Sequence, residues 1–166
     1  MNNILIYTFF NYTRKTSKAL YELDTEKYHI EKLFIPNTFS TKKLLEQIPK
    51  YRYVIGIADN NRNAKRSRYD PKYVNRYGRR IIIENGMEEY VSNWDIVLPD
   101  TFYKYEGITN GPCNRSAYLI MNEIISNQFD TKFGFFHLCK DTVKEDFEKM
   151  ILFTSRTTKS PSISIF

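Results

Sequence analysis

The sequence predicts an α/β protein, a three-layer α/β/α sandwich with a central mixed sheet, and three observations lead to this prediction. The chain has 166 residues, which suits one domain with a substantial core. Hydrophobic residues make up 42% of it, a composition typical of globular proteins and not of disordered ones. Short apolar runs alternate with segments of helical spacing, and this alternation is typical of α/β layer folds.

The first third of the chain repeats a strand–helix order. Residues 3–10 are apolar, β-branched or aromatic, as in a strand that is buried on both faces. Residues 16–23 follow a polar loop and carry apolar side chains at helical spacing after a Thr-Ser start. The next expected elements are a strand over 28–35, a helix over 38–48 and a strand over 51–58.

The remainder is less regular. Residues 59–86 are polar, basic and poor in periodicity, so we expect a long loop, which in a compact domain is usually functional. The other expected elements are short strands at 81–83 and 95–98, a helix at 113–127, a strand at 131–138 and a helix at 142–154. We therefore expect one domain over residues 1–154 and a Ser/Thr-rich tail over 155–166.

Composition argues against several classes of protein. The two cysteines, Cys113 and Cys139, are too few for a disulfide framework and lack metal-ligand spacing, so we expect neither a metal nor another cofactor. The N-terminus has no signal-peptide pattern, and no apolar run approaches the ~20 residues of a membrane span. We expect a cytoplasmic protein without a membrane partner.

Part of the +6 net charge is concentrated in one segment, and a basic segment favours acidic partners. Tyr69, Tyr73 and Tyr77 alternate with its basic residues, a pattern in which cations neutralise phosphates and rings stack on bases. One hypothesis is therefore nucleic-acid binding, and the alternative is a solvated insertion. The basic residues are Lys65, Arg66, Arg68, Arg76, Arg79 and Arg80.

Four segments of the chain carry a family resemblance. They are 8–13 (TFFNYT), 56–62 with 70–75 (GIADNNR, DPKYVN), 113–122 (CNRSAYLIMN) and 134–139 (GFFHLC). In this order they resemble the pyroglutamyl-peptidase (pyrrolidone-carboxylate peptidase) family, whose motifs read G-F-x-P-F-G, G-x-A-G-G-R with E-R-x-A-x-N, S-N-x-A-G-x-Y-x-C-N and G-F-x-H-x-P. The resemblance implies a phosphorylase/hydrolase-like α/β/α fold and a Cys-His-acid site that cleaves an N-terminal pyroglutamyl residue.

The resemblance also assigns roles to individual residues. His137 stands at the family's histidine and would be the general base. Asp70 stands at the family's glutamate and would orient it. Phe9 and Tyr12 would be walls of the pocket that holds the lactam. For each of these residues, the alternative is an ordinary structural role.

The family's nucleophile is the difficult position. A match on the two asparagines, Asn114 and Asn122, places it on Met121, and a one-residue shift places it on Ile120. Neither side chain can act as a nucleophile. Cys113 stands at the expected helix N-terminus, where the helix dipole lowers a thiol pKa, but two helical turns, about 12 Å, separate it from Met121.

We therefore expect a pyroglutamyl-peptidase-like protein that has lost its catalysis and binds a peptide N-terminus or a small molecule. One alternative is an active hydrolase that uses Cys113, Ser116 or water activated by His137, and another is the nucleic-acid-binding protein described above. Cys139, two residues beyond His137, is a further candidate thiol, although both cysteines have the alternative of being buried and inert. The many tyrosines are also compatible with a homo-oligomer.

Overall fold

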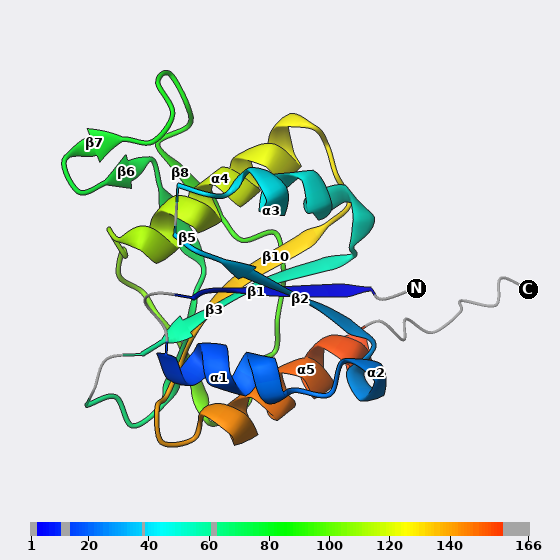
Figure 1. The fold of residues 1–166 in the computed structure, drawn as a ribbon. Helices are drawn as coiled ribbons and strands as arrows, with labels where there is room; N and C mark the ends of the chain where they lie inside the picture. Colours follow the sequence, from blue (N-terminus) through cyan, green and yellow to red (C-terminus); the bar gives the residue numbers. More distant parts are fainter. Residues whose placement is uncertain (1–2, 11–13, 38, 61–62, 158–166) are drawn as a thin grey trace, which may run out of the picture.

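A six-stranded mixed sheet forms the centre of the computed structural model, which describes residues 3–10, 14–37, 39–60 and 63–157 (Figure 1). Four strands, in the order β2-β1-β3-β10, are parallel; β4 pairs antiparallel with β10 and parallel with β9 at the edge. Their bounds are β2 (Ile30–Ile35), β1 (Ile4–Phe9), β3 (Tyr53–Asp59), β10 (Lys132–Leu138), β4 (Ser67–Asp70) and β9 (Phe102–Lys104). The mixed sheet predicted from the sequence is confirmed.

Helices cover both faces of this sheet. α1 (Arg14–Glu22) and α5 (Val143–Thr157) lie on one face, and α3 (Lys42–Gln47) and α4 (Pro112–Ser126) lie on the other (Figure 1). The short α2 (Thr25–Tyr28) leads into β2, and the 3₁₀ turn η1 (Ile48–Lys50) follows α3. The three-layer α/β/α architecture is therefore confirmed.

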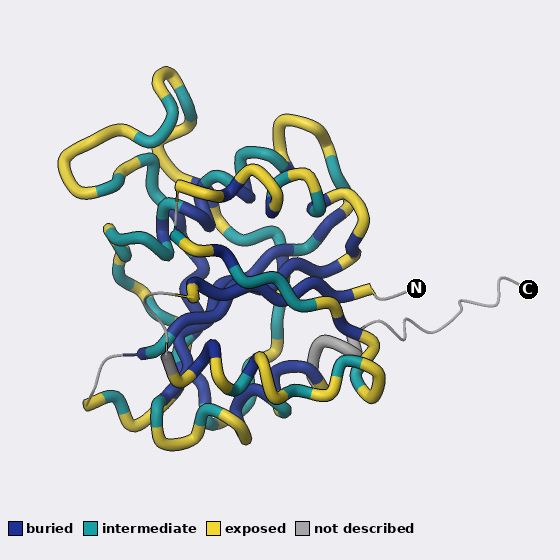
Figure 2. Tube along the Cα trace, viewed as in Figure 1, coloured by how far each residue is buried: buried dark blue, intermediate teal, exposed yellow. Residues whose placement is uncertain are grey.

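Each face of the sheet has its own hydrophobic core, and the central strands are buried throughout (Figure 2). Successive residues of a strand point to opposite faces, so β1 sends Leu5 and Tyr7 toward α4 and Ile4 and Ile6 toward α1 and α5. This double burial explains why these segments are continuous apolar runs rather than alternating ones.

The segment expected to be a long loop contains four strands. β4 belongs to the main sheet, β5 (Lys72–Val74) pairs with β8 (Glu89–Val91), and β6 (Arg76–Tyr77) pairs with β7 (Arg80–Ile81). The prediction of a long loop over residues 59–86 is therefore wrong. The strands in this segment are short and contain charged residues, so the sequence shows no apolar run that would indicate a strand.

Three smaller expectations also change. Of the expected strand 81–83, only Ile81 is in a strand, as the second residue of β7 (Arg80–Ile81), and residues 95–98 form none. α5 runs to Thr157, into the expected tail, of which 158–166 lie outside the described residues. Within the described residues, no helix has the length and apolar character needed to cross a membrane.

Candidate active site

Strand register brings four polar and aromatic side chains to one face of the sheet. In the antiparallel pair β10–β4, Phe135 lies opposite Asp70 and His137 lies opposite Arg68. Residues two apart on a strand share a face, so these four side chains lie together at the end of β10. Phe135 belongs to the core beneath α4, which places this face under the start of that helix.

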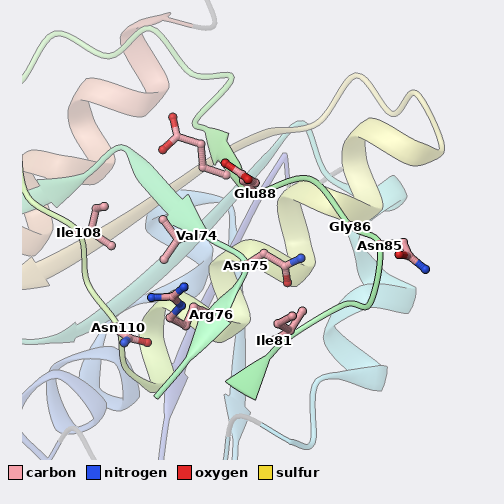
Figure 3. Close-up of a pocket in the computed structure, with 10 residues that line it drawn as sticks. Val74, Asn75, Arg76, Ile81, Asn85, Gly86, Glu88, Ile108 and Asn110 are labelled. Atoms are coloured by element: carbon pink, nitrogen blue, oxygen red, sulfur yellow. The ribbon is translucent and has the colours of Figure 1, made fainter. Parts of the chain in front are cut away.

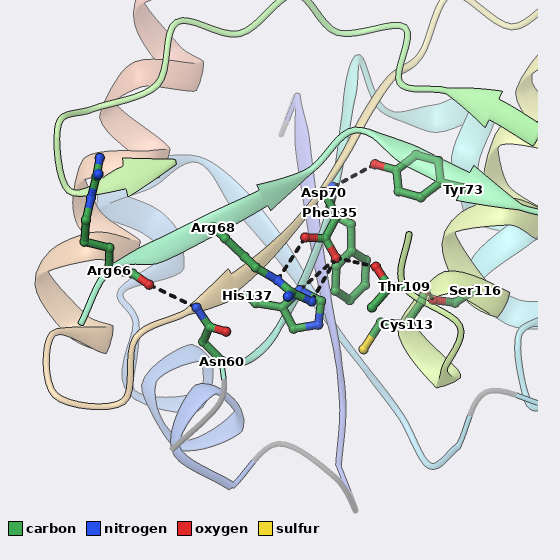
Figure 4. Close-up of polar contacts among 10 residues, drawn as sticks. All are labelled: Asn60, Arg66, Arg68, Asp70, Tyr73, Thr109, Cys113, Ser116, Phe135 and His137. Atoms are coloured by element: carbon green, nitrogen blue, oxygen red, sulfur yellow. Dashed lines mark hydrogen bonds and ion pairs between the residues drawn. The ribbon is translucent and has the colours of Figure 1, made fainter. Parts of the chain in front are cut away.

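Asp70 is the centre of the cluster (Figure 4). Its Oδ2 lies 3.1 Å from His137 Nδ1 and accepts a hydrogen bond of 2.8 Å from the Thr109 hydroxyl. Its Oδ1 lies 3.0 Å from Arg68 Nε, and the side chains of Asp70 and Arg68 are only 4% and 16% exposed. The carboxylate therefore contacts the histidine ring at Nδ1, and Nε2 is the nitrogen left for a reacting group.

Cys113 lies at the second position of α4, after the N-cap Gly111, and its side chain is half-buried. Figure 4 shows its sulfur beside Thr109, on the side of the helix where His137 and Asp70 lie. The pKa of the Cys113 thiol is raised to about 12, mainly by burial and also by the negative charge of Asp70, while the Arg68 guanidinium acts in the opposite direction. The expectation of a pKa lowered by the helix terminus is therefore wrong, and the thiol needs a base to remove its proton.

The positions predicted for the missing nucleophile are in the core. Ile120 and Met121 are 0% and 1% exposed and pack among the hydrophobic side chains between α4 and the sheet. The structure instead places the Cys113 thiol within electrostatic range of Asp70, and Figure 4 shows it on the side of the helix where His137 lies. The two-turn distance from Met121 therefore does not separate Cys113 from this cluster.

The other candidate nucleophiles are inaccessible. The Ser116 hydroxyl is fully buried, lies 3.1 Å from Tyr7 Oη and donates to the Cys113 carbonyl. Cys139 is 2% exposed, and its thiol donates to the carbonyl of Ala64 at 3.0 Å. Neither side chain has the exposed surface that a reacting group needs.

The predicted aromatic walls are not supported. Phe9 is fully buried and packs edge-to-face on Tyr7 with ring centroids 6.0 Å apart, so it offers no surface to a ligand. Tyr12 lies outside the described residues. Phe10, which directly follows Phe9 and β1, is 66% exposed. Of the described aromatic residues in this segment, it is the one whose ring has surface available for a ligand.

The basic segment does not form one surface. Arg68 is paired with Asp70 and lies over the Tyr105 ring at 4.3 Å, while Arg66 donates to the carbonyl of Asp100 at 2.8 Å. Tyr69 and Tyr73 are buried and are not available to stack on bases. Four members of the basic cluster are exposed, and within the described residues their side chains donate no hydrogen bond to a backbone carbonyl. They are Lys65, Arg76, Arg79 and Arg80.

Arg68 and Thr109 are site residues that the sequence did not reveal. Arg68 and Asp70 are two residues apart on β4, a spacing that is compatible with an ion pair on one face of the strand. The sequence pattern instead assigns Arg68 to the basic surface cluster. Thr109 gave no signal, because it reaches Asp70 from a segment 39 residues away. In the described part of the chain, no three His, Cys, Asp or Glu side chains come together as a metal site.

Comparison with known proteins finds similar structures but no similar sequences. No protein-family profile and no curated protein sequence matches this chain. Among solved structures, pyroglutamyl peptidase I of Bacillus amyloliquefaciens matches with a TM-score of 0.77 and 14% identity over 94% of this chain and 98% of that one. The pyrrolidone carboxyl peptidase of Thermococcus litoralis matches with a TM-score of 0.71 and 15% identity over 100% of both chains. That of Fervidobacterium islandicum AW-1 matches with a TM-score of 0.69 and 12% identity over 93% of this chain and 98% of that one. The chain therefore has the fold of the pyroglutamyl peptidases.

Proposed function

We propose that this protein is an active cysteine peptidase that hydrolyses the amide bond after an N-terminal pyroglutamyl residue. Cys113 is the nucleophile, His137 is the general base, and Asp70 orients the histidine. One observation carries the proposal: a buried carboxylate lies 3.1 Å from His137 Nδ1, beside a half-buried thiol at the start of α4. The substrate class comes from the named structural neighbours.

The arrangement supplies each part of an acyl transfer. His137 takes the thiol proton as the Cys113 sulfur bonds to the carbonyl carbon, and it then gives that proton to the leaving amine as the C–N bond breaks. Water hydrolyses the resulting thioester and restores the thiol. The first backbone N–H groups of a helix have no intrahelical acceptor, so those of Cys113 and Asn114 are suited to stabilise the oxyanion.

This proposal replaces the expectation of a degenerate enzyme. That expectation depended on the register that matched Asn114 and Asn122 to the family motif. The same motif ends in Cys-Asn, and Cys113-Asn114 reproduces that dipeptide. In this second register the nucleophile is retained, although the serine, first asparagine, alanine, glycine and tyrosine of the motif are not.

Hydrolysis of a fluorogenic pyroglutamyl amide tests the proposal. We expect turnover by the unmodified protein, loss of at least ~100-fold in Cys113→Ala and His137→Ala, and retention in Cys139→Ala, the matched control for thiol removal. Absence of turnover by the unmodified, folded protein would contradict it. So would turnover that survives Cys113→Ala.

A further inference from the structure

A cleft of about 550 Å³ lies beside the strands that follow Asp70 (Figure 3). Its volume is in the range of small-ligand sites. Arg76 and Asn110 lie on one side of it, and Ile81 and Gly86 lie on the other (Figure 3). The catalytic chemistry described above does not use this cleft.

The cleft adjoins the reactive centre through two connections. Ile108 and Asn110 line the cleft, whereas Thr109 between them donates to Asp70, so this segment is a wall that the cleft and the reactive centre share. On another side, the carbonyl of Arg76, also a lining residue, accepts a hydrogen bond of 2.8 Å from the Asn114 side chain. The cleft therefore begins within one helical turn of Cys113.

Hydrogen bonds hold the cleft in shape. The Asn75 side chain accepts from the N–H groups of Ile82 and Ile83, at 3.1 and 2.8 Å, and donates to the Ile83 carbonyl at 2.8 Å. The Gly86 N–H donates to the same carbonyl at 3.1 Å. A preformed cleft of this kind loses little entropy when a ligand binds.

The lining combines apolar walls with charge. Val74, Ile81 and Ile108 provide apolar surface, and two carboxylates, Glu88 and Glu89, outnumber the guanidinium of Arg76. Within the described part of the chain, the side chains of Glu88, Glu89 and Arg76 make no ion pair. The lining therefore carries two negative charges and one positive charge, on a protein whose net charge is +6, and this favours a cationic ligand group.

We infer that this cleft binds the leaving-group side of the substrate, the peptide that follows the scissile bond, and favours lysine or arginine there. The inference rests on the proposed function, because it places the peptide bond at Cys113. An extended peptide advances about 3.3 Å per residue, so the residues directly after the scissile bond reach the wall formed by Ile108 and Asn110. Glu88 and Glu89, which line the cleft, are the residues whose charge we expect to attract the cationic side chain.

The test compares kcat/KM for three substrates: a pyroglutamyl aminocoumarin amide, pyroglutamyl-Lys-Ala-Ala amide and pyroglutamyl-Asp-Ala-Ala amide. We expect the Lys peptide to exceed the Asp peptide by about fivefold or more, and the Glu88→Gln/Glu89→Gln variant to remove most of this ratio. Glu84→Gln, an exposed carboxylate of the same loop outside the lining, is the matched control and should keep the ratio. Equal rates for the two peptides, or a ratio that the double variant does not change, would overturn the inference.

The aminocoumarin amide separates failure of the inference from failure of the proposed function, since it has no peptide on the leaving side. If the aminocoumarin amide is not hydrolysed, calorimetry of Lys-peptide binding at low ionic strength tests the cleft without catalysis. Binding that weakens in the Glu88→Gln/Glu89→Gln variant and persists in Glu84→Gln would support the cleft as a peptide site without catalysis. Absence of binding would overturn it.

Discussion

Replacing Asp70 by asparagine removes one negative charge from the buried cluster and keeps the size of the side chain. Arg68 then loses its partner at 3.0 Å while its side chain remains only 16% exposed. The Thr109 hydroxyl still finds an oxygen acceptor, so its hydrogen bond persists. The main effect is therefore an unpaired, largely buried guanidinium.

Removal of one partner from a buried ion pair costs about 3–5 kcal/mol. The Tyr105 ring, 4.3 Å from the Arg68 guanidinium carbon, makes a cation–π interaction of about 0.5–1 kcal/mol with Arg68 in both proteins, so it does not change this difference. We therefore expect Asp70→Asn to lower the free energy of unfolding by about 3 kcal/mol. With a urea m-value of about 2 kcal/mol/M, the midpoint of unfolding should fall by about 1.5 M.

Urea unfolding at pH 7 measures this change, and a double-mutant cycle identifies its cause. Arg68→Met combined with Asp70→Asn removes both charges, so the double variant should be more stable than Asp70→Asn alone. A loss below about 1 kcal/mol in the single variant would refute the reasoning. So would a double variant whose destabilisation equals the sum of its two single variants.

Three further substitutions test other parts of the structure. Burial raises the pKa of Tyr69 to about 12, so between pH 10 and 12 the unfolded chain loses a proton that the folded chain keeps; stability should fall by about 2 kcal/mol at pH 12, and Tyr69→Phe should remove this part of the fall in denaturant titrations. Gly56→Ala should lower Tm, because its Cβ would lie 2.3 Å from Cδ2 of Phe135 and overpacking costs about 1–3 kcal/mol. Asn114→Ala should cost about 2–4 kcal/mol in urea unfolding, because its amide makes three hydrogen bonds to the β5–β6 backbone.

Each of these predictions has its own control or contrary result. Equal alkaline slopes for the parent protein and Tyr69→Phe would contradict the first. For the second, Gly111→Ala is the control, because its Cβ would meet nothing within 4 Å and its φ of −137° suits any residue; an equal effect in both variants would argue against the clash. For the third, Asn122→Ala removes the acceptor of one hydrogen bond, from Tyr90, and an Asn114→Ala loss no larger than this would contradict the anchoring role.

Sequence patterns predicted the layers of the fold because the central strands are buried on both faces. Residues 53–59 and 132–138 have continuous apolar runs for that reason. β4 escaped prediction because its sequence, Ser67–Asp70, contains an arginine and an aspartate. These two charges form an ion pair inside the protein. From composition alone, charged residues are expected to be exposed to solvent.

Motif reasoning identified two of the proposed catalytic residues, and the structure places them in contact. His137 was found because a glycine–phenylalanine pair precedes it, and Asp70 because it kept the charge of the family's glutamate. The motif position favours Phe9 as a pocket wall, but Phe9 is the last residue of the buried strand β1 and is fully buried in the core. Motif position therefore selected two polar residues that lie in contact, whereas the apolar residue that it selected, Phe9, is buried.

The choice between Met121 and Cys113 as the nucleophile position depends on which asparagine is matched to the family motif. Matching both asparagines counts Asn114 and Asn122 as equivalent evidence, but their environments differ. Asn114 is 2% exposed and binds the backbone of β5 and β6 through three hydrogen bonds, whereas Asn122 accepts one bond from Tyr90.

Because Asn114 binds the strands that continue from Asp70, the start of α4 is fixed beside the carboxylate that contacts His137. The residue directly before Asn114 is therefore held at the reactive centre, and that residue is Cys113. Eight residues later, at about 1.5 Å per residue, Met121 lies about 12 Å further along the helix, within the core. The asparagine that anchors the helix thus favours the register in which a thiol, Cys113, is the proposed nucleophile.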